Sequence, residues 1–223
     1  MTDNRRQITD GRRQMTVWGN GVVMSGARYL LLFILFSLQA AVSVAEESPA
    51  SAEYVVLNVV NNVLKVLDDP QLEQKQKRLI VFGLVSNHIH FEEMARRILS
   101  VHWKDATDSQ KIQFIQLFER NLLNSYWVRI SRYAGEQIKY VASSQDLKGF
   151  ATVDTIIERD NEEVVIPVTY RMKYNGLEWQ AYDFLVENLS LVQNYQREYS
   201  AVIKNSGIDG LLEHMRREIS HFQ

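Results

Sequence analysis

The chain has 223 residues, of which 46% are hydrophobic, with 25 basic and 27 acidic side chains and no cysteine. A formal net charge of −2 without a long basic run argues against a nucleic-acid-binding domain and against a polybasic membrane-surface protein. The absence of cysteine excludes a disulfide framework and a lipid anchor attached to an N-terminal cysteine. Stability must therefore come from core packing, which the chain length allows.

Residues 1–45 have the pattern of a secretory signal peptide. Arg28 precedes a strongly apolar run of ten residues, YLLLFILFSL (29–38), and SVA (43–45) fits the small-x-small pattern of a cleavage site. The alternative is a membrane anchor, but a helix needs roughly 20 apolar residues to span a bilayer. We therefore expect export to the periplasm. Translation from Met24 would leave a compact signal peptide of the same kind.

Cleavage after residue 45 would leave a short polar leader (46–52) and a single domain (53–223). The signal peptide would remove five arginines and two aspartates, so the mature chain would carry 20 basic and 25 acidic residues, a net charge of −5. We expect this modestly acidic domain to be a soluble monomer that binds no nucleic acid.

Apolar residues at helical spacing predict three helices at the start of the domain. The first begins at Glu53. Asp69 followed by Pro70 is typical of an N-cap with proline in the first turn, and it predicts the start of the second. The third helix is shorter, contains Phe91 and ends around Trp103.

The longest predicted helix covers residues 108–133. Thr107 and Gln110 have the spacing of a capping box at its start, and Gly135 is expected to be its C-cap. Its apolar stripe is wide, and such a stripe fits either a plain core or the wall of a ligand site. The residues of the stripe that we expect to cover a sheet are Ile115, Phe118, Leu122 and Tyr126.

After Gly135 the apolar period changes to two, which predicts strands. Residues 160–163 form a turn, and Asn175-Gly176 is a strong hairpin signal. Short connections of this kind make the sheet antiparallel. A helix over 189–204, a break at Gly207 and a second short helix follow. The fold class is therefore α+β, and the predicted strands are 138–143, 151–159, 164–174 and 177–187.

A two-residue Asn175-Gly176 turn would pair Tyr174 with Leu177 and fix the register of the last hairpin; a four-residue loop would keep the same parity. We expect N-terminal helices to pack on a strongly twisted, cone-like, four-stranded sheet, with C-terminal helices beyond it and an apolar cavity between sheet and helices. A filled core is the alternative. The predicted sheet wall of the cavity is Ile166, Val168, Tyr170, Met172, Trp179, Ala181 and Leu185.

Asp183 falls on this apolar face, where a carboxylate must be hydrogen-bonded. We expect a structural acid bound to backbone amides or to an arginine; the alternative is a general base beside Tyr170 or Tyr182. The motifs G-x-S-x-G, the Walker loop and the dinucleotide-binding glycine pattern are absent from the sequence. His88 and His90 alone do not make a zinc site. The sequence therefore predicts no enzyme, no metal site and no cofactor.

Five segments of the chain, taken together and in this order, carry a resemblance to a known family. They are IHFEEMARRILSVHW (89–103), DATDSQKIQFIQLFERNLLNSY (105–126), RYAGEQIKY (132–140), IPVTYRMKY (166–174) and WQAYDFLVENLSLVQNYQREY (179–199). These segments resemble the MlaC or toluene-tolerance auxiliary family of periplasmic phospholipid-binding proteins, and the resemblance covers nearly all of residues 53–222. The family usually has other residues at His90, Ser100, Asn188 and Gln196.

This resemblance implies a soluble carrier that shields the acyl tails of a phospholipid. Family members exchange lipid with an outer-membrane lipoprotein–porin complex and an inner-membrane ABC transporter, and so maintain outer-membrane lipid asymmetry. The departures leave open a related carrier associated with hopanoid export. The predicted cavity offers no basic cluster to grip a phosphate, so we expect headgroups in solvent and weak headgroup selectivity.

Overall fold

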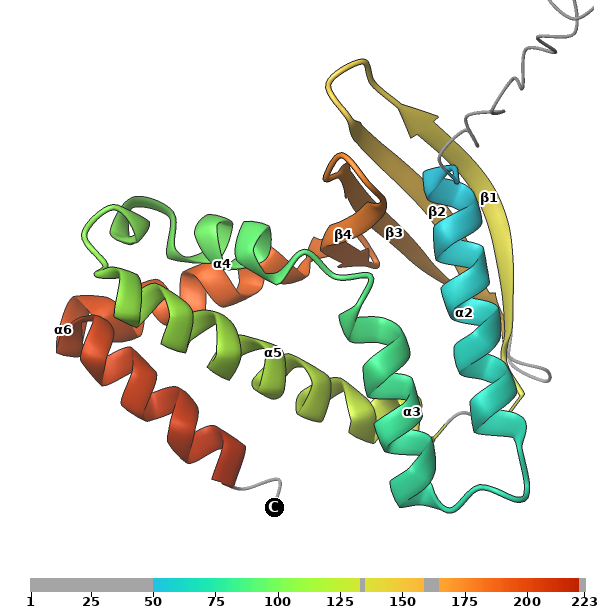
Figure 1. Ribbon diagram of the computed structural model, residues 1–223, viewed down its shortest axis with the longest axis horizontal. Coiled ribbons are helices and arrows are strands. Elements are labelled where there is room, and N and C mark those ends of the chain that lie inside the picture. Colours follow the sequence, from blue (N-terminus) through green and yellow to red (C-terminus); the bar gives the residue numbers. More distant parts are fainter. Residues whose placement is uncertain (1–49, 133–134, 159–164, 221–223) are drawn as a thin grey trace, which may run out of the picture. The chain divides into compact units, whose positions relative to one another are not determined.

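The computed structural model describes residues 50–132, 135–158 and 165–220 (Figure 1). The expected signal peptide (1–45) lies outside these residues, as do most of the leader and the expected turn at 160–163. The described part contains five α-helices, a short 3-10 helix and a five-stranded antiparallel sheet. The α+β prediction is confirmed.

Helix α2 (Ala52–Asp68) begins where the Ser51 hydroxyl accepts a hydrogen bond from the N–H of Tyr54 at 3.1 Å. It packs along β1 and β2 of the sheet (Figure 1). The predicted N-cap at Asp69 is wrong. Asp69 closes α2 instead, and its Oδ1 accepts from the N–H of Gln71 at 2.8 Å. This local turn uses the carboxylate that would have capped a following helix.

Helix α3 (Gln74–Ser86) starts four residues after Pro70, with Glu73 and Gln76 as its capping box. Each side chain of the box bonds the backbone N–H of the other residue, so two N–H groups that the helix leaves unpaired are satisfied. The Gln76 side chain accepts from the N–H of Glu73 at 2.9 Å.

Helices α4 (Phe91–Leu99), η1 (Ser100–Trp103) and α5 (Asp108–Ile130) follow. The predicted capping box is confirmed: the N–H of Gln110 donates to the hydroxyl of Thr107 at 3.2 Å, and the N–H of Thr107 donates to Gln110 Oε1 at 2.9 Å. Helix α5 ends earlier than predicted, with Ser131 rather than Gly135 as its C-cap.

The sheet contains the four predicted strands in the order of the chain. They are followed by a fifth strand of two residues, β5 (Leu189–Ser190), which extends the predicted four-stranded sheet. The other strands are β1 (Gln137–Gln145), β2 (Phe150–Glu158), β3 (Val165–Tyr174) and β4 (Trp179–Val186).

The prediction of a two-residue turn between β3 and β4 is wrong. Tyr174 pairs with Trp179 instead of Leu177, so the loop has four residues. The Asn175 side chain holds this loop, because its Oδ1 accepts hydrogen bonds from the N–H groups of Leu177 (2.9 Å) and Glu178 (3.0 Å). A four-residue loop keeps the parity of a two-residue turn, so the start of β4 faces the expected side.

A β-bulge then reverses the faces of the rest of β4. Ala181 pairs with Met172, but Asp183 pairs with the preceding residue, Arg171. Tyr182 is therefore an extra residue, and every later side chain of β4 turns to the other face. Asp183 and Leu185 leave the apolar face, where we had expected them, and Phe184 and Val186 take their place.

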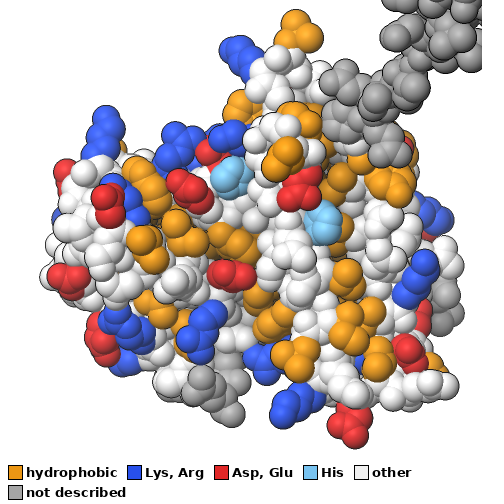
Figure 2. Space-filling model, in the orientation of Figure 1, with side chains coloured by type: hydrophobic (Ala, Val, Ile, Leu, Met, Phe, Trp, Pro, Cys, Tyr) orange, Lys and Arg blue, Asp and Glu red, His pale blue; other side chains and the backbone are white. Residues whose placement is uncertain are grey.

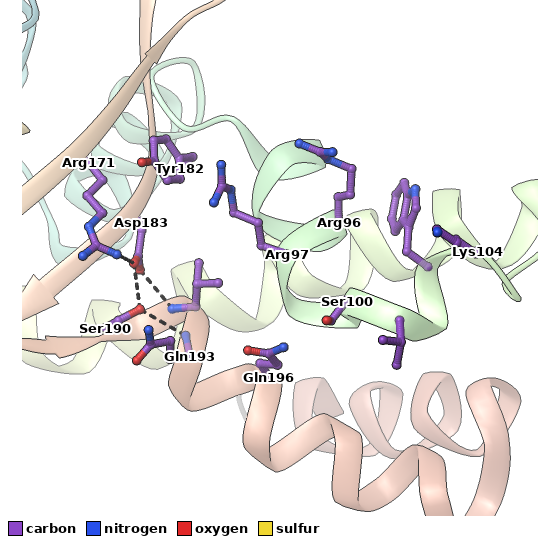
Figure 3. A pocket seen from close by; sticks show the side chains of 13 residues that line it. Arg96, Arg97, Ser100, Lys104, Arg171, Tyr182, Asp183, Ser190, Gln193 and Gln196 are labelled. Atoms are coloured by element: carbon purple, nitrogen blue, oxygen red, sulfur yellow. Dashed lines mark hydrogen bonds and ion pairs between the residues drawn. The ribbon is translucent and has the colours of Figure 1, made fainter. Parts of the chain in front are cut away.

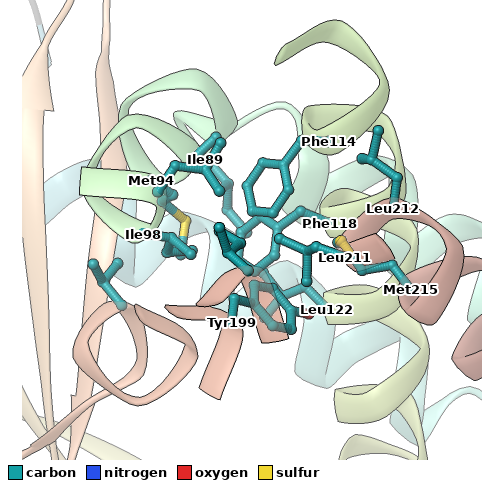
Figure 4. Close-up of a cluster of buried hydrophobic side chains, with 14 residues drawn as sticks. Ile89, Met94, Ile98, Phe114, Phe118, Leu122, Tyr199, Leu211, Leu212 and Met215 are labelled. Atoms are coloured by element: carbon teal, nitrogen blue, oxygen red, sulfur yellow. The ribbon is translucent and has the colours of Figure 1, made fainter. Parts of the chain in front are cut away.

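Helix α6 (Leu191–Ser220) consists of two arms that meet at Gly207, as the sequence predicted. Gly207 has φ 69° and ψ −176°, a conformation that is essentially restricted to glycine. The arms pack with α4 and α5 around a filled core (Figure 4). Its largest buried side chains include Met94, Ile98, Phe114, Phe118, Tyr199, Leu211, Leu212 and Met215.

Candidate functional site

An apolar cavity of about 340 Å³ lies between the helices and the sheet. Its walls come from α2, α3, the C-terminal half of α5 and the inner face of β1 to β4. Among the described residues that line it, there is no carboxylate, lysine or arginine, and His88 is the one histidine. The wall is therefore mainly hydrocarbon and suits an apolar ligand.

Helix α2 supplies the largest part of the helical wall. Its lining residues repeat in pairs one turn apart, which places a stripe two side chains wide toward the sheet. The sequence predicts a helix with an apolar face here, but not that this face lines the cavity. The width of the stripe was the available signal. These residues are Val55, Val56, Val59, Val60, Val63 and Leu64.

Hydrophobic side chains also reach the surface of the helical layer. Figure 2 shows them over α2, α3 and α5, interspersed with charged side chains. Tyr54 on α2, Leu79 on α3 and Ile112 on α5 are each more than half exposed. Among the described residues, no helix is long and apolar enough to cross a membrane.

Six of the eleven residues that we predicted to contact lipid line the cavity. The strand pairing explains the sheet members: Val168, Tyr170 and Met172 alternate along β3, and Ala181 pairs with Met172 before the bulge. The six are Leu122, Tyr126, Val168, Tyr170, Met172 and Ala181.

The other five lie elsewhere. Phe118 is fully buried in the helical core (Figure 4), and Ile115 packs against the same core, because the first half of α5 faces α4 and α6. Trp179 belongs to a packed cluster between α2 and the sheet. The bulge removes Leu185 from the cavity face. Ile166 pairs with Ile157, which lines the cavity, but does not line it itself.

The hydroxyl groups in the cavity wall stay neutral. Burial raises the pKa of Tyr126 and of Tyr170 above the ordinary value of 10.0. His88 also lines the cavity, and its Nδ1 donates to the Leu84 carbonyl at 2.9 Å. Among the described residues that line it, the cavity therefore offers no acid–base pair and presents a mainly apolar surface.

Asp183 lies on the other face of β4 and is fully occupied as an acceptor. Oδ1 accepts from the N–H groups of Phe184 (2.9 Å) and Val192 (3.0 Å), and Oδ2 from the Ser190 hydroxyl (2.7 Å) and Arg171 (3.2 Å). These are the backbone and arginine contacts that we expected of a structural acid. Tyr170, proposed as its partner in catalysis, lies on the cavity face instead.

The two histidines of the sequence motif serve the backbone. His90 is the N-cap of α4, and its Nδ1 accepts from the N–H of Glu93 at 3.3 Å. A different group, Glu198, His214 and Glu218 on α6, has one ligand atom from each residue within 4.8 Å of the others. That group is outside the cavity lining.

The sequence of this chain is similar to those of known proteins. The family model described as MlaC protein matches residues 57–217. The intermembrane phospholipid transport system binding protein MlaC of Haemophilus influenzae is 20% identical over 201 residues, which cover 86% of this chain and 92% of that protein.

The phospholipid-binding protein from Ralstonia solanacearum, solved in complex with a phospholipid, has the same fold. It is 22% identical, with a TM-score of 0.69 over 78% of this chain and 99% of its own. Because the matching family model also spans most of the sequence, from the valine stripe of α2 into the second arm of α6, the chain belongs to the MlaC family.

Proposed function

We propose that this protein is a periplasmic carrier of phospholipid. The cavity of about 340 Å³ carries the proposal, because its walls are almost entirely hydrocarbon. Each CH₂ group moved from water into such a site gains roughly 0.8 kcal/mol, so acyl tails match its chemistry. The names of the two relatives, one a phospholipid transport protein and one a phospholipid-binding protein, support the same cargo.

The tails would lie between α2 and the inner face of the sheet. They would contact the six predicted lining residues named above and the paired valines of α2. Headgroups would remain in solvent, since no cation lines the cavity in the described part of the chain. Headgroup selectivity would therefore be weak.

The carrier would exchange lipid between an outer-membrane lipoprotein–porin complex and an inner-membrane ABC transporter, and so maintain lipid asymmetry in the outer membrane. Family membership and the transport system named for the relative support this assignment. The signal-peptide pattern of residues 1–45 supports a periplasmic location.

The protein would act without catalysis. Asp183, the candidate general base, accepts four hydrogen bonds and lies on the face of β4 away from the cavity. A base must be within reach of a substrate proton and free to accept it, and this carboxylate is engaged by the N-terminus of α6 instead.

Native mass spectrometry of the mature protein purified from the periplasm tests the carrier proposal. We expect a protein–phospholipid complex whose headgroups follow their abundance in the cell. A lipid-free mass, with no uptake from phospholipid vesicles, would contradict the proposal. A bound hopanoid would assign the cavity to that cargo, and strong enrichment of one headgroup would contradict weak selectivity.

A further inference from the structure

A second concavity, of about 720 Å³, lies on the outer side of β4, between α4, η1 and the first turns of α6 (Figure 3). We call it the basic groove. Its charged lining consists of four cations and one carboxylate: Arg96, Arg97, Lys104, Arg171 and Asp183.

A buried carboxylate of α4, that of Glu93, neutralises only part of this charge. Glu93 has a side chain that is 4% exposed, and three cations share it. Arg96 approaches it at 2.7 Å, Arg97 at 2.8 Å and Lys173 at 2.9 Å. One negative charge therefore serves three positive charges.

The carboxylate of the groove lining, that of Asp183, already binds groups within the protein. Asp183 is saturated by Arg171, the Ser190 hydroxyl and two backbone N–H groups. Lys104 is exposed and has no ion pair within the part of the chain that the structure describes. The four cations of the lining and Lys173 thus share two carboxylates, Glu93 and Asp183, so this group of side chains carries an excess of three positive charges, in a protein whose formal net charge is −2.

The cationic groups are both held and accessible. The Arg97 guanidinium lies 4.3 Å from the centroid of the Tyr182 ring, which fixes its direction. The side chain of Arg96 is 54% exposed. The amide side chains of Gln193 and Gln196 also line the groove and add donors along its α6 side (Figure 3). Arginine forks fixed in this way bind carboxylates with two hydrogen bonds each.

We propose that the basic groove binds an acidic segment of a partner protein. The positive groups follow the groove from Arg171 on β3, past Arg97 and Arg96 on α4, to Lys104 at the end of η1, instead of converging on one point (Figure 3). This favours an extended ligand with several carboxylates over a single small anion, and a narrow segment over a flat membrane surface. The inference rests on the proposed function, because a carrier must dock on the proteins with which it exchanges cargo.

The segment WQAYDFLVENLSLVQNYQREY (179–199) contributes side chains to both the basic groove and the apolar cavity. Its residues divide between the two sites: Ala181, Phe184 and Leu191 line the apolar cavity, whereas Tyr182, Asp183, Gln193 and Gln196 line the groove. Strand β4 and the start of α6 therefore separate a partner segment in the basic groove from the proposed cargo in the apolar cavity.

A labelled peptide tests the proposal. The probe is a fluorescein-labelled hexaglutamate flanked by Gly-Ser, and its binding to the mature protein is measured by fluorescence anisotropy. The variant Arg96→Glu/Lys104→Glu should lose at least about tenfold in affinity, and the wild-type affinity should fall as salt rises. Lys104→Glu alone, at a residue without an ion pair in the described chain, should weaken binding in the same direction.

Arg120→Glu/Lys204→Glu is the matched control. Both residues are exposed and lie outside the groove lining, so the same change in net charge should alter affinity by less than about twofold. An equal loss of peptide affinity in Arg96→Glu/Lys104→Glu and in the control would overturn the proposal. Retention of the peptide by both groove variants would also overturn it.

Phosphatidylglycerol vesicles and native mass spectrometry complete the test. Groove-dependent binding to the vesicles without binding to the peptide would make the groove a membrane site and overturn the proposal. Groove variants that lose the peptide but keep phospholipid would support it. Wild-type protein without lipid would refute the carrier function separately, because peptide binding is measured independently of cargo.

Discussion

A single side chain can distinguish a ligand cavity from a packed core. Val168 and Val153 are both buried on the inner face of the sheet, with exposed fractions of 7% and 0%. Val168 lines the cavity and pairs with Val186, not with Asp183 as the predicted register required. Val153 lies in the packed cluster between α2 and the sheet. The two positions therefore differ in free space and not in hydrophobicity.

Val168→Glu should remove bound lipid while the domain stays folded, because the cavity leaves room for a carboxylate and water. Val153→Glu, the matched control, should cost several kcal/mol of unfolding free energy because its carboxylate enters a packed cluster. Thermal melting and lipid content by mass spectrometry measure both effects. A folded Val168→Glu protein that keeps its lipid would show that this wall does not contact the cargo.

Glu93 gives the stability of the protein a defined pH dependence. Burial alone would raise its pKa, but hydrogen bonds from Lys173 and Arg96 outweigh burial and lower the pKa from 4.5 to about 2. A carboxyl whose pKa is lower in the folded state stabilises the fold above its unfolded pKa. This stabilisation is lost as pH falls through the folded pKa.

Glu93→Gln should therefore be less stable than the wild type at pH 7, by on the order of 3 kcal/mol. The difference should shrink as pH falls from about 5 toward about 2. Urea unfolding of both proteins across this range measures it. A difference that is independent of pH would show that Glu93 contributes through packing alone.

At the scale of the elements, the sequence was sufficient where a local rule decides the outcome. The capping box of Thr107 and Gln110 places the start of α5, and the break at Gly207 divides α6. The sequence is insufficient where contacts between residues far apart in the chain determine the structure. The bulge at Tyr182 accompanies the pairing of Asp183 with Arg171 and with the start of α6. No pattern within β4 contains that information.

The same distinction explains the candidate site. Alternation along β3 was enough to assign Val168, Tyr170 and Met172 to the cavity. The contribution of α2 depends on which helix covers the inner face of the sheet, and amphipathicity gives each helix an apolar face without naming its partner. Phe118 was assigned to the site for that reason, although α5 uses this residue to pack on α4 and α6.

Glycine substitutions test the break in α6. Gly207→Ala should destabilise the protein by about 1–3 kcal/mol, because φ 69° with ψ −176° strains any residue with a Cβ. Gly83→Ala is the control: an added Cβ there meets nothing within 4 Å in helix α3, and alanine should stabilise it by roughly 0.5–1 kcal/mol. Denaturant unfolding compares them. A neutral Gly207→Ala would show that the arms can rearrange without cost.

The domain combines a packed helical core with a helix, α2, that mainly lines the cavity. The helical core of α4, α5 and α6 contains fully buried aromatic side chains such as Phe114, Phe118 and Tyr199. Helix α2 has only Ala52 and Val56 among its fully buried residues, although six of its side chains face the cavity. Most apolar side chains of α2 therefore form the wall of the cavity and not part of a fully buried core.

Hydrogen exchange should reveal this difference when lipid is removed. In the delipidated protein, amides of α2 should exchange faster than in the lipid-loaded protein, since the acyl tails of the proposed cargo would add apolar contacts between α2 and the sheet. Amides of α5 around Phe114 and Phe118 should keep their protection, because that core is packed without the cargo. Mass spectrometry of peptides from both states measures the two regions in one experiment. An equal change in α2 and α5 would mean that the cargo stabilises the domain as one unit, and no change in α2 would mean that the helix is held by the sheet alone.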